Sequence, residues 1–155
     1  MTAVWGQSEE APESIDIDCG SFWPKIATGK FYDEYRIPAE LPAATVKGHL
    51  QQAVIRVRKA LAEYRAAQEL AGHEKLSDVP QDEIDKTGEK LLLFERAVYC
   101  EAKAEILRET VTVDRKKDAE NAAKSAEETE EKYREFAADA MRTLVDEDRI
   151  SIELL

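Results

Sequence analysis

Three glutamates that recur at every fourth position are the residues best suited, by type and spacing, to acid–base chemistry. Glu101, Glu105 and Glu109 would line one edge of a helix. Paired carboxylates serve as acid and base when a pocket drives their pKa values apart. The sequence around them does not indicate such a pocket. We therefore interpret the three side chains as part of a solvated helix face.

Histidine and cysteine, which could bind a metal or act as nucleophiles, are few and scattered. His49 and His73 fall in different segments and belong to neither an HExxH nor an ExxH pattern. Cys19 and Cys100 have no CxxC spacing and no evident base partner, so we expect two reduced thiols rather than a disulfide. A carboxylate–metal enzyme is set aside as a third hypothesis, because histidine ligands are missing.

The dipeptide Gly29-Lys30 looks superficially like the end of a phosphate-binding loop. That motif needs a glycine at position 24 and a hydroxyl residue at position 31, but Pro24 and Phe31 stand there. No serine lies in a GxSxG turn. The sequence therefore predicts no enzyme activity, no cofactor and no metal.

The charge of this 155-residue chain limits the partners it can bind. A net charge of −11 disfavours a protein that grips nucleic acid or docks on an anionic membrane. No stretch approaches the roughly 18 apolar residues of a membrane span, and no signal peptide is visible, so we expect a soluble protein.

Residues 45–73 depart from the acidic balance, with 5 bases against 2 acids. We expect this basic segment to contact acidic surfaces of a neighbouring subunit.

Residues 1–44 form the first of three predicted regions. Their prolines and glycines arrive at short intervals and disfavour a helix, which predicts an extended arm. The arm is rich in aromatic residues, namely Trp5, Phe22, Trp23, Phe31, Tyr32 and Tyr35. Side chains of this kind pack on something, either the chain's own core or the next subunit.

The second region, residues 45–148, is predicted to hold three long helices, over residues 45–70, 89–111 and 119–145. The first has a single apolar stripe, made of Val46, Leu50, Ala53, Val57, Leu61 and Tyr64. The stripe of the third comprises Ala122, Ala126, Thr129, Tyr133, Phe136, Ala140 and Leu144, widened by Ala137 and Met141.

The middle helix is apolar on two sides. One stripe contains Leu93, Ala97, Cys100, Ala104, Leu107 and Val111, and the other contains Leu91, Phe94, Val98, Ala102 and Ile106. Such a helix is either central in its bundle or shared with another subunit. The expected fold class is therefore all-α: a small bundle of three long helices, with an extended N-terminal arm and a short extended C-terminal tail.

Two further segments are candidate contact surfaces. Residues 73–88 form a connection that is long for a compact bundle. Residues 149–155, the third region, alternate apolar and polar side chains with the period of a β-strand. A strand without a partner in its own bundle can add to the sheet of another chain. We therefore predict that residues 149–155 are a docking tail.

With these segments placed, a set of short pieces stands out in chain order: Phe22-Trp23-Pro24, Tyr35-Arg36-Ile37-Pro38, Leu76-Ser77-Asp78-Val79-Pro80 with Ile84-Asp85, Arg96-Ala97-Val98, the Ala102/Ala104 helix that ends Ile106-Leu107-Arg108-Glu109, and Ile152-Glu153-Leu154-Leu155. Through this ordered set the sequence resembles the phage head-completion (GpL) family of contractile-tailed temperate phages. The loop from Leu76 to Pro80 is the most specific piece. The family often has a glycine after the Ile-Asp pair, where this chain has Lys86, so we expect a reshaped turn there.

The resemblance implies a structural virion protein rather than an enzyme. It implies a head–tail adaptor that forms a twelvefold ring under the portal, stabilises the DNA-filled head and provides a platform for neck and tail attachment. The implied partners are the portal protein, neighbouring copies of the chain and a downstream neck or tail-terminator protein. DNA would pass through the lumen without sequence-specific binding, and no membrane is implied. Assembly would take place in the host cytoplasm.

Within this interpretation, residues are assigned to two contacts. Portal docking is predicted for Ile150, Ile152, Glu153, Leu154 and Leu155, and contact between subunits for Phe22, Trp23, Phe31, Tyr32, Tyr35, Leu91, Phe94 and Val98. The alternative is a cytoplasmic helical module that binds or scaffolds another protein. That alternative explains the helices and charges but leaves the aromatic arm and the tail unexplained.

Overall fold

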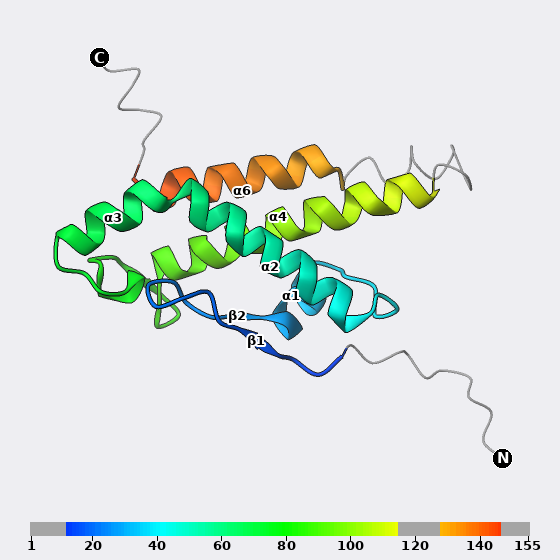
Figure 1. Cartoon of the computed structure of the whole chain (residues 1–155), viewed down its shortest axis with the longest axis horizontal. Helices are drawn as coiled ribbons and strands as arrows, with labels where there is room; N and C mark the ends of the chain where they lie inside the picture. The colour runs from blue at the N-terminus through cyan, green and yellow to red at the C-terminus, as the bar shows by residue number, and fades with distance from the viewer. Residues whose placement is uncertain (1–11, 115–127, 147–155) are drawn as a thin grey trace.

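The computed structural model describes residues 12–114 and 128–146 of the chain, with side chains at 111–114 left out of the description. The elements in chain order are β1 (Asp16–Ile17), β2 (Ile26–Ala27), α1 (Thr28–Glu34), α2 (Ala43–Ala60), α3 (Ala62–Leu70), η1 (Leu76–Asp78), β3 (Glu83–Ile84), β4 (Thr87–Gly88), α4 (Glu89–Asp114) and α6 (Glu130–Leu144). Figure 1 shows α4 between α2 and α6, with β1, β2 and α1 packed along the lower side of these helices. The chain is mostly helical, as predicted, but two small antiparallel hairpins make the all-α, three-helix description too simple.

The helix expected over residues 45–70 is bent into two. Leu61 has a ψ of 13°, which ends α2 and begins α3. Helical hydrogen bonds still cross the bend, because the Leu61 N–H donates to the Val57 carbonyl at 3.0 Å and the Arg65 N–H donates to the Leu61 carbonyl at 2.9 Å. The predicted apolar stripe is confirmed, since Val46, Leu50, Ala53, Val57 and Leu61 are all buried.

The middle helix, α4, is apolar on two sides because it is central. It packs against α2 and against α6, and both of its predicted stripes contribute fully buried residues. Phe94, Val98 and Ala102 come from one stripe, and Ala97 and Cys100 from the other. The two-sided pattern is therefore explained within a single chain.

The N-terminal region is folded from residue 12 onward, so the extended-arm prediction is wrong for residues 12–44. Strands β1 and β2 pair antiparallel, with Ile17 opposite Ile26, and α1 follows directly. The aromatic side chains turn back onto α4: the Trp23 ring stacks on Phe94 at 4.7 Å between centroids. Such large apolar rings are shielded from water by folding back on the nearest helix.

Helix α6 presents small residues to α4. Ala137, Ala140 and Leu144 are buried, whereas Phe136, expected in the apolar stripe, remains 36% exposed. The helices approach closely through alanines, so burial centres on the smallest side chains and Phe136 is left at the edge. The predicted start of this helix, residues 119–127, lies outside the described residues.

The long connection between α3 and α4 is itself structured. It contains η1 and the β3–β4 hairpin, in which Glu83 pairs with Gly88 and Ile84 with Thr87. The two turn residues, Asp85 and Lys86, have φ values of 50° and 64°. Two successive positive φ values are typical of a type I′ turn, whose twist suits a tight hairpin.

Candidate assembly surfaces

The residues considered for catalysis do not meet in a catalytic arrangement. Within residues 12–114 and 128–146, no group of three or more histidine, cysteine or carboxylate side chains could hold a metal ion. Cys19 and Cys100 are both free and buried, as expected from the sequence. Burial raises the pKa of the Cys19 thiol to about 11, and a thiol that stays protonated is a poor nucleophile.

The expected solvated face of glutamates is wrong for two of its three members. The side chains of Glu101 and Glu105 are only 13% and 16% exposed. Arg134 of α6 reaches both carboxylates, at 3.0 Å and 2.7 Å, and Arg56 of α2 reaches Glu105 at 3.0 Å. Hydrogen bonding from Arg134 holds the pKa of Glu105 below its usual range. The two arginines pair with both carboxylates, so the group ties three helices together.

Glu109, the third member of the row, behaves as expected. Its side chain is 63% exposed, and its Oε2 lies 3.1 Å from Nε2 of His49. The pair joins α4 to α2 near the surface and contains a single carboxylate and a single imidazole. Neither residue has the further ligands that a metal site would need within the described part of the chain.

A buried lysine at the start of α4 holds the end of α6. The Lys90 ammonium donates to the Leu144 carbonyl at 2.6 Å and to the Asp146 carboxylate at 3.0 Å. It also lies 5.5 Å from the centre of the Tyr64 ring, a cation–π contact. Sequence reasoning missed Lys90, because a single lysine in a charged helix gives no sign of burial. This contact fixes the point from which the chain continues toward the predicted docking tail.

An open pocket of about 440 Å³ lies beside Lys90. Its lining is mainly polar and comes from the β3–β4 hairpin region, the start of α4 and the end of α6: Pro80, Gln81, Asp82, Glu89, Lys90, Leu93, Thr143 and Asp146. Because Lys90 already has two oxygen partners, this pocket has no free buried charge to recognise a ligand. We interpret it as a surface hollow beside the Lys90 contact.

The residues predicted to contact a neighbouring subunit lie mostly inside the chain's own core. Phe22, Trp23, Phe31, Tyr32, Phe94 and Val98 are buried, and Tyr35 and Leu91 are partly buried against them. Packing within one chain is enough to explain why these residues are apolar. Their role between subunits stays a prediction, but the buried six present almost no surface to a neighbour.

Other residues form the exposed apolar surface. Ile55 on α2 is 56% exposed, Leu70 at the end of α3 is 91% exposed, and Ile84 in the β3–β4 hairpin is 54% exposed. The predicted portal-docking residues, Ile150, Ile152, Glu153, Leu154 and Leu155, lie outside the described residues. No described helix is long and apolar enough to cross a membrane.

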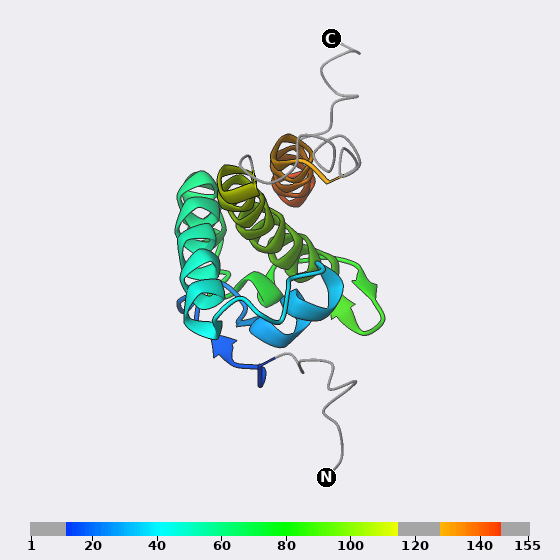
Figure 2. The same ribbon diagram turned by 90° about the vertical axis from the view of Figure 1, so that its right-hand side faces the viewer.

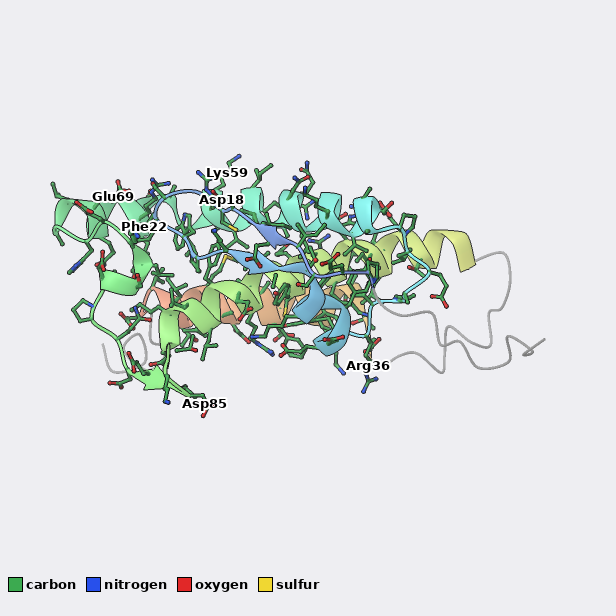
Figure 3. The ribbon with its side chains drawn as sticks, turned by 90° about the horizontal axis from the view of Figure 1, so that it is seen from below. Asp18, Phe22, Arg36, Lys59, Glu69 and Asp85 are labelled. Atoms are coloured by element: carbon green, nitrogen blue, oxygen red, sulfur yellow. The ribbon has the colours of Figure 1, made fainter. Side chains whose placement is uncertain are left out.

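A second surface hollow, of about 380 Å³, opens beside Ile55. We call it the basic pocket; it is lined by Trp23, Ile55, Arg58, Lys59, Ala62 and Arg65. Figure 3 shows Lys59 at the outer surface of α2, with the Phe22 segment nearby. Three bases of the segment 45–73, Arg58, Lys59 and Arg65, thus lie on one particular face, and the contact of this segment with a neighbouring subunit stays a prediction.

These features define a class of protein: a small helical chain whose ionic groups hold its own helices together and whose outer face combines apolar and charged side chains. Residues 17–155 match the family model described as "Phage head completion protein (GPL)". The chain belongs to the phage head completion family.

Individual relatives agree with this assignment. The chain is 28% identical to the "Head completion/stabilization protein" of Escherichia phage P2 over 108 residues, covering 70% of this chain and 64%, just under two thirds, of that protein. It is 25% identical to the "Probable head completion/stabilization protein" of Haemophilus phage HP1 (strain HP1c1) over 150 residues, covering 97% of this chain and 98% of that protein. No solved structure matches the chain.

Proposed function

We propose that the chain is a structural protein of the phage virion that completes and stabilises the DNA-filled head. The observation that carries this proposal is the family match, which spans residues 17–155 and so includes every described element except the first residue of β1, Asp16. In the proposed arrangement, copies of the chain form a twelvefold ring under the portal. The ring retains the genome and provides a platform for the neck and tail, without enzymatic activity.

The described structure supports an assembly role in two ways. The ionisable clusters around Arg134 and Lys90 are internal contacts between helices. The exposed face, by contrast, carries apolar and charged groups that are free to meet another surface. The net charge of −11 suits a ring through which DNA moves with little adhesion, because like charges repel.

The portal is the proposed first partner, and the tail over residues 149–155 is its proposed docking element. Lys90 fixes the end of α6 only a few residues before that tail. The alternation of Ile150, Ile152 and Leu154 with polar residues matches the pattern of a strand that adds to the edge of another chain's sheet.

Two experiments test the proposal. Phage particles assembled without the chain should lose their DNA, and mass spectrometry should detect the chain in complete particles; its absence from mature particles would refute a virion role. Replacing residues 149–155 by a glycine–serine segment of equal length should leave the helical circular dichroism unchanged and abolish co-sedimentation with the portal. Portal binding at the wild-type level by that variant would refute the docking assignment.

A further inference from the structure

The β3–β4 hairpin presents an exposed isoleucine among acidic side chains. Ile84 is 54% exposed, and Asp82, Glu83 and Asp85 around it are exposed as well. Within the described residues, none of these three carboxylates forms an ion pair. Ile84 thus has three unpaired carboxylates within two residues in the sequence, against one exposed base, Lys86, and this combination suits a basic surface with an apolar floor.

This hairpin is fixed rigidly to the body of the protein. The Gln81 amide donates to the Leu76 carbonyl at 2.8 Å and to the Val79 carbonyl at 3.0 Å, while its oxygen accepts from the Lys90 N–H at 2.8 Å. A Cβ at Gly88 would overlap the Gln81 side chain, so the glycine permits this close contact. A preformed element binds with a smaller loss of conformational entropy than a flexible loop.

The basic pocket has the complementary character. Arg58 and Lys59 are exposed and form no ion pair within the described part of the chain, and Ile55 beside them is 56% exposed. The pocket is also lined by Trp23, which is 4% exposed and whose indole N–H has no hydrogen-bond acceptor. Unpaired cations beside an exposed apolar side chain favour an acidic, partly apolar partner.

The two surfaces lie on opposite sides of the molecule. Figure 2 shows α2 at one edge and the β3–β4 hairpin projecting at the other. In Figure 3, which is turned about a different axis, Lys59 and Asp85 are again on opposite sides. The hairpin therefore cannot reach the pocket of its own chain. Complementary surfaces on opposite sides of identical subunits join them head to tail, and such contacts generate a ring where the rotation between neighbours closes.

We propose that the β3–β4 hairpin of one copy docks in the basic pocket of the next copy, with Ile84 against Ile55 and the hairpin carboxylates facing Arg58 and Lys59. This inference rests on the proposed function, since it specifies the contact between neighbours in the ring. It differs from the sequence-based assignment, which gave that contact to aromatic residues that are now found in the core.

Charge reversal in two separate variants tests the pairing. One variant carries Arg58→Glu and Lys59→Glu, the other Asp82→Lys and Glu83→Lys. Alone, each places like charges at every contact, and we expect phage titre and incorporation of the chain into particles to fall at least tenfold. Produced together, the two variants can alternate around the ring, which places opposite charges at every contact, and incorporation should recover. Wild-type incorporation of either variant alone, or no recovery with both, overturns the proposal.

The controls for this experiment separate charge from folding. Lys25→Glu with Lys75→Glu changes the net charge by the same amount at exposed lysines outside both surfaces, and it should incorporate normally. Helical circular dichroism and unfolding midpoints should match the wild type for every variant. A loss of incorporation in this control equal to that of the pocket variant would overturn the assignment.

A cysteine pair tests the same contact directly. In particles that contain Ile55→Cys together with Ile84→Cys, a short bismaleimide should join neighbouring copies into a ladder of multimers. Each single variant should give no species larger than a dimer, since the native thiols are buried. Absence of the wild-type chain from particles prepared in parallel would refute the proposed function. Presence of the chain without a ladder, or a cross-link from position 84 to a different protein, would refute the inference alone.

Discussion

The guanidinium of Arg134 on α6 lies 2.7 Å from the carboxylate of Glu105 on α4, measured from Nη2 to Oε1. The same guanidinium reaches Glu101 at 3.0 Å, and Arg56 on α2 approaches Glu105 at 3.0 Å. Two of the three buried residues of α6, Ala137 and Ala140, are alanines, which bury little apolar surface. Charged hydrogen bonds of this kind therefore supply part of the orientation and stability of that helix pair.

Replacing Arg134 by methionine should destabilise the protein. The substitution keeps the aliphatic stem but leaves two largely buried carboxylates with fewer donors, at a cost of about 1–2 kcal/mol after allowance for partial exposure. Chemical denaturation monitored by circular dichroism measures the change. Arg142→Met, which removes only an exposed pair with Asp139, should change stability by less than about 0.5 kcal/mol. Equal losses in the two variants would contradict the role of Arg134.

The same contact predicts a pH dependence. Because Arg134 lowers the pKa of Glu105 in the folded state, its stabilising contribution is fully present above the ordinary glutamate pKa of about 4.3 and is lost as the pH falls through the lower folded value. The difference in unfolding free energy between wild type and Arg134→Met should therefore shrink on acidification. Denaturant titrations from neutral pH downward measure it. A difference that stays constant down to the acid transition would contradict the assignment.

The turn at the tip of the β3–β4 hairpin offers a test by substitution of one residue. Lys86 has a φ of 64°, a conformation that costs a non-glycine residue roughly 1 kcal/mol. Lys86→Gly should remove this cost and therefore stabilise the protein. The gain should be only a few tenths of a kcal/mol up to about 1 kcal/mol, because the greater conformational entropy of glycine in the unfolded chain offsets part of it. Lys86→Val should destabilise it, because a β-branched side chain fits that region poorly. Thermal unfolding of both variants measures the two effects. A higher stability of Lys86→Val than of Lys86→Gly would disprove the prediction.

Periodicity in the sequence predicted the helices and the stripe of α2 because burial of an apolar face has a direct signature at every third or fourth residue. The same periodicity predicted two apolar faces on α4. It left open whether α4 is central in its own bundle or shared with another subunit. The structure shows that α2 and α6 cover them. The resemblance to the head completion family was confirmed by the family match, and its expected glycine after Ile84-Asp85 corresponds to the left-handed residue Lys86.

The folded N-terminal region and the ionic contacts were not predicted, for a physical reason. Glycine and proline do disfavour long helices, but they permit short turns such as those that bring Trp23 onto Phe94. The partners of Glu101 and Lys90 lie more than thirty positions away in the chain. A local pattern contains no information about such distant partners, so Glu101 was assigned to a solvated face and Lys90 was missed.

The burial of the aromatic residues can be tested with a truncation. Phe94→Ala should destabilise the isolated chain by about 3–5 kcal/mol, because it removes a fully buried ring stacked on Trp23. Ile55→Ala, at an exposed site, should have little effect on the isolated chain. If Phe94 acted mainly between subunits, its truncation would leave the dilute monomer almost unchanged and would weaken association instead. Unfolding curves at low protein concentration distinguish the two outcomes.

Lys90 joins the beginning of α4 to the end of α6, and its removal should loosen the region from which the chain leads to residues 149–155. In Lys90→Met the Leu144 carbonyl loses a buried charged donor, for which we expect a loss of about 1.5–3 kcal/mol. Beyond the global loss, amide hydrogen exchange in the last turn of α6 should accelerate more than exchange at the centre of α4. Lys86→Met, an exposed lysine in the nearby turn, provides the control. A uniform acceleration of amide exchange across all helices would mean that Lys90 contributes only to overall stability. An acceleration confined to the last turn of α6 would mean that Lys90 fixes the end of α6, from which the chain leads to the proposed docking tail.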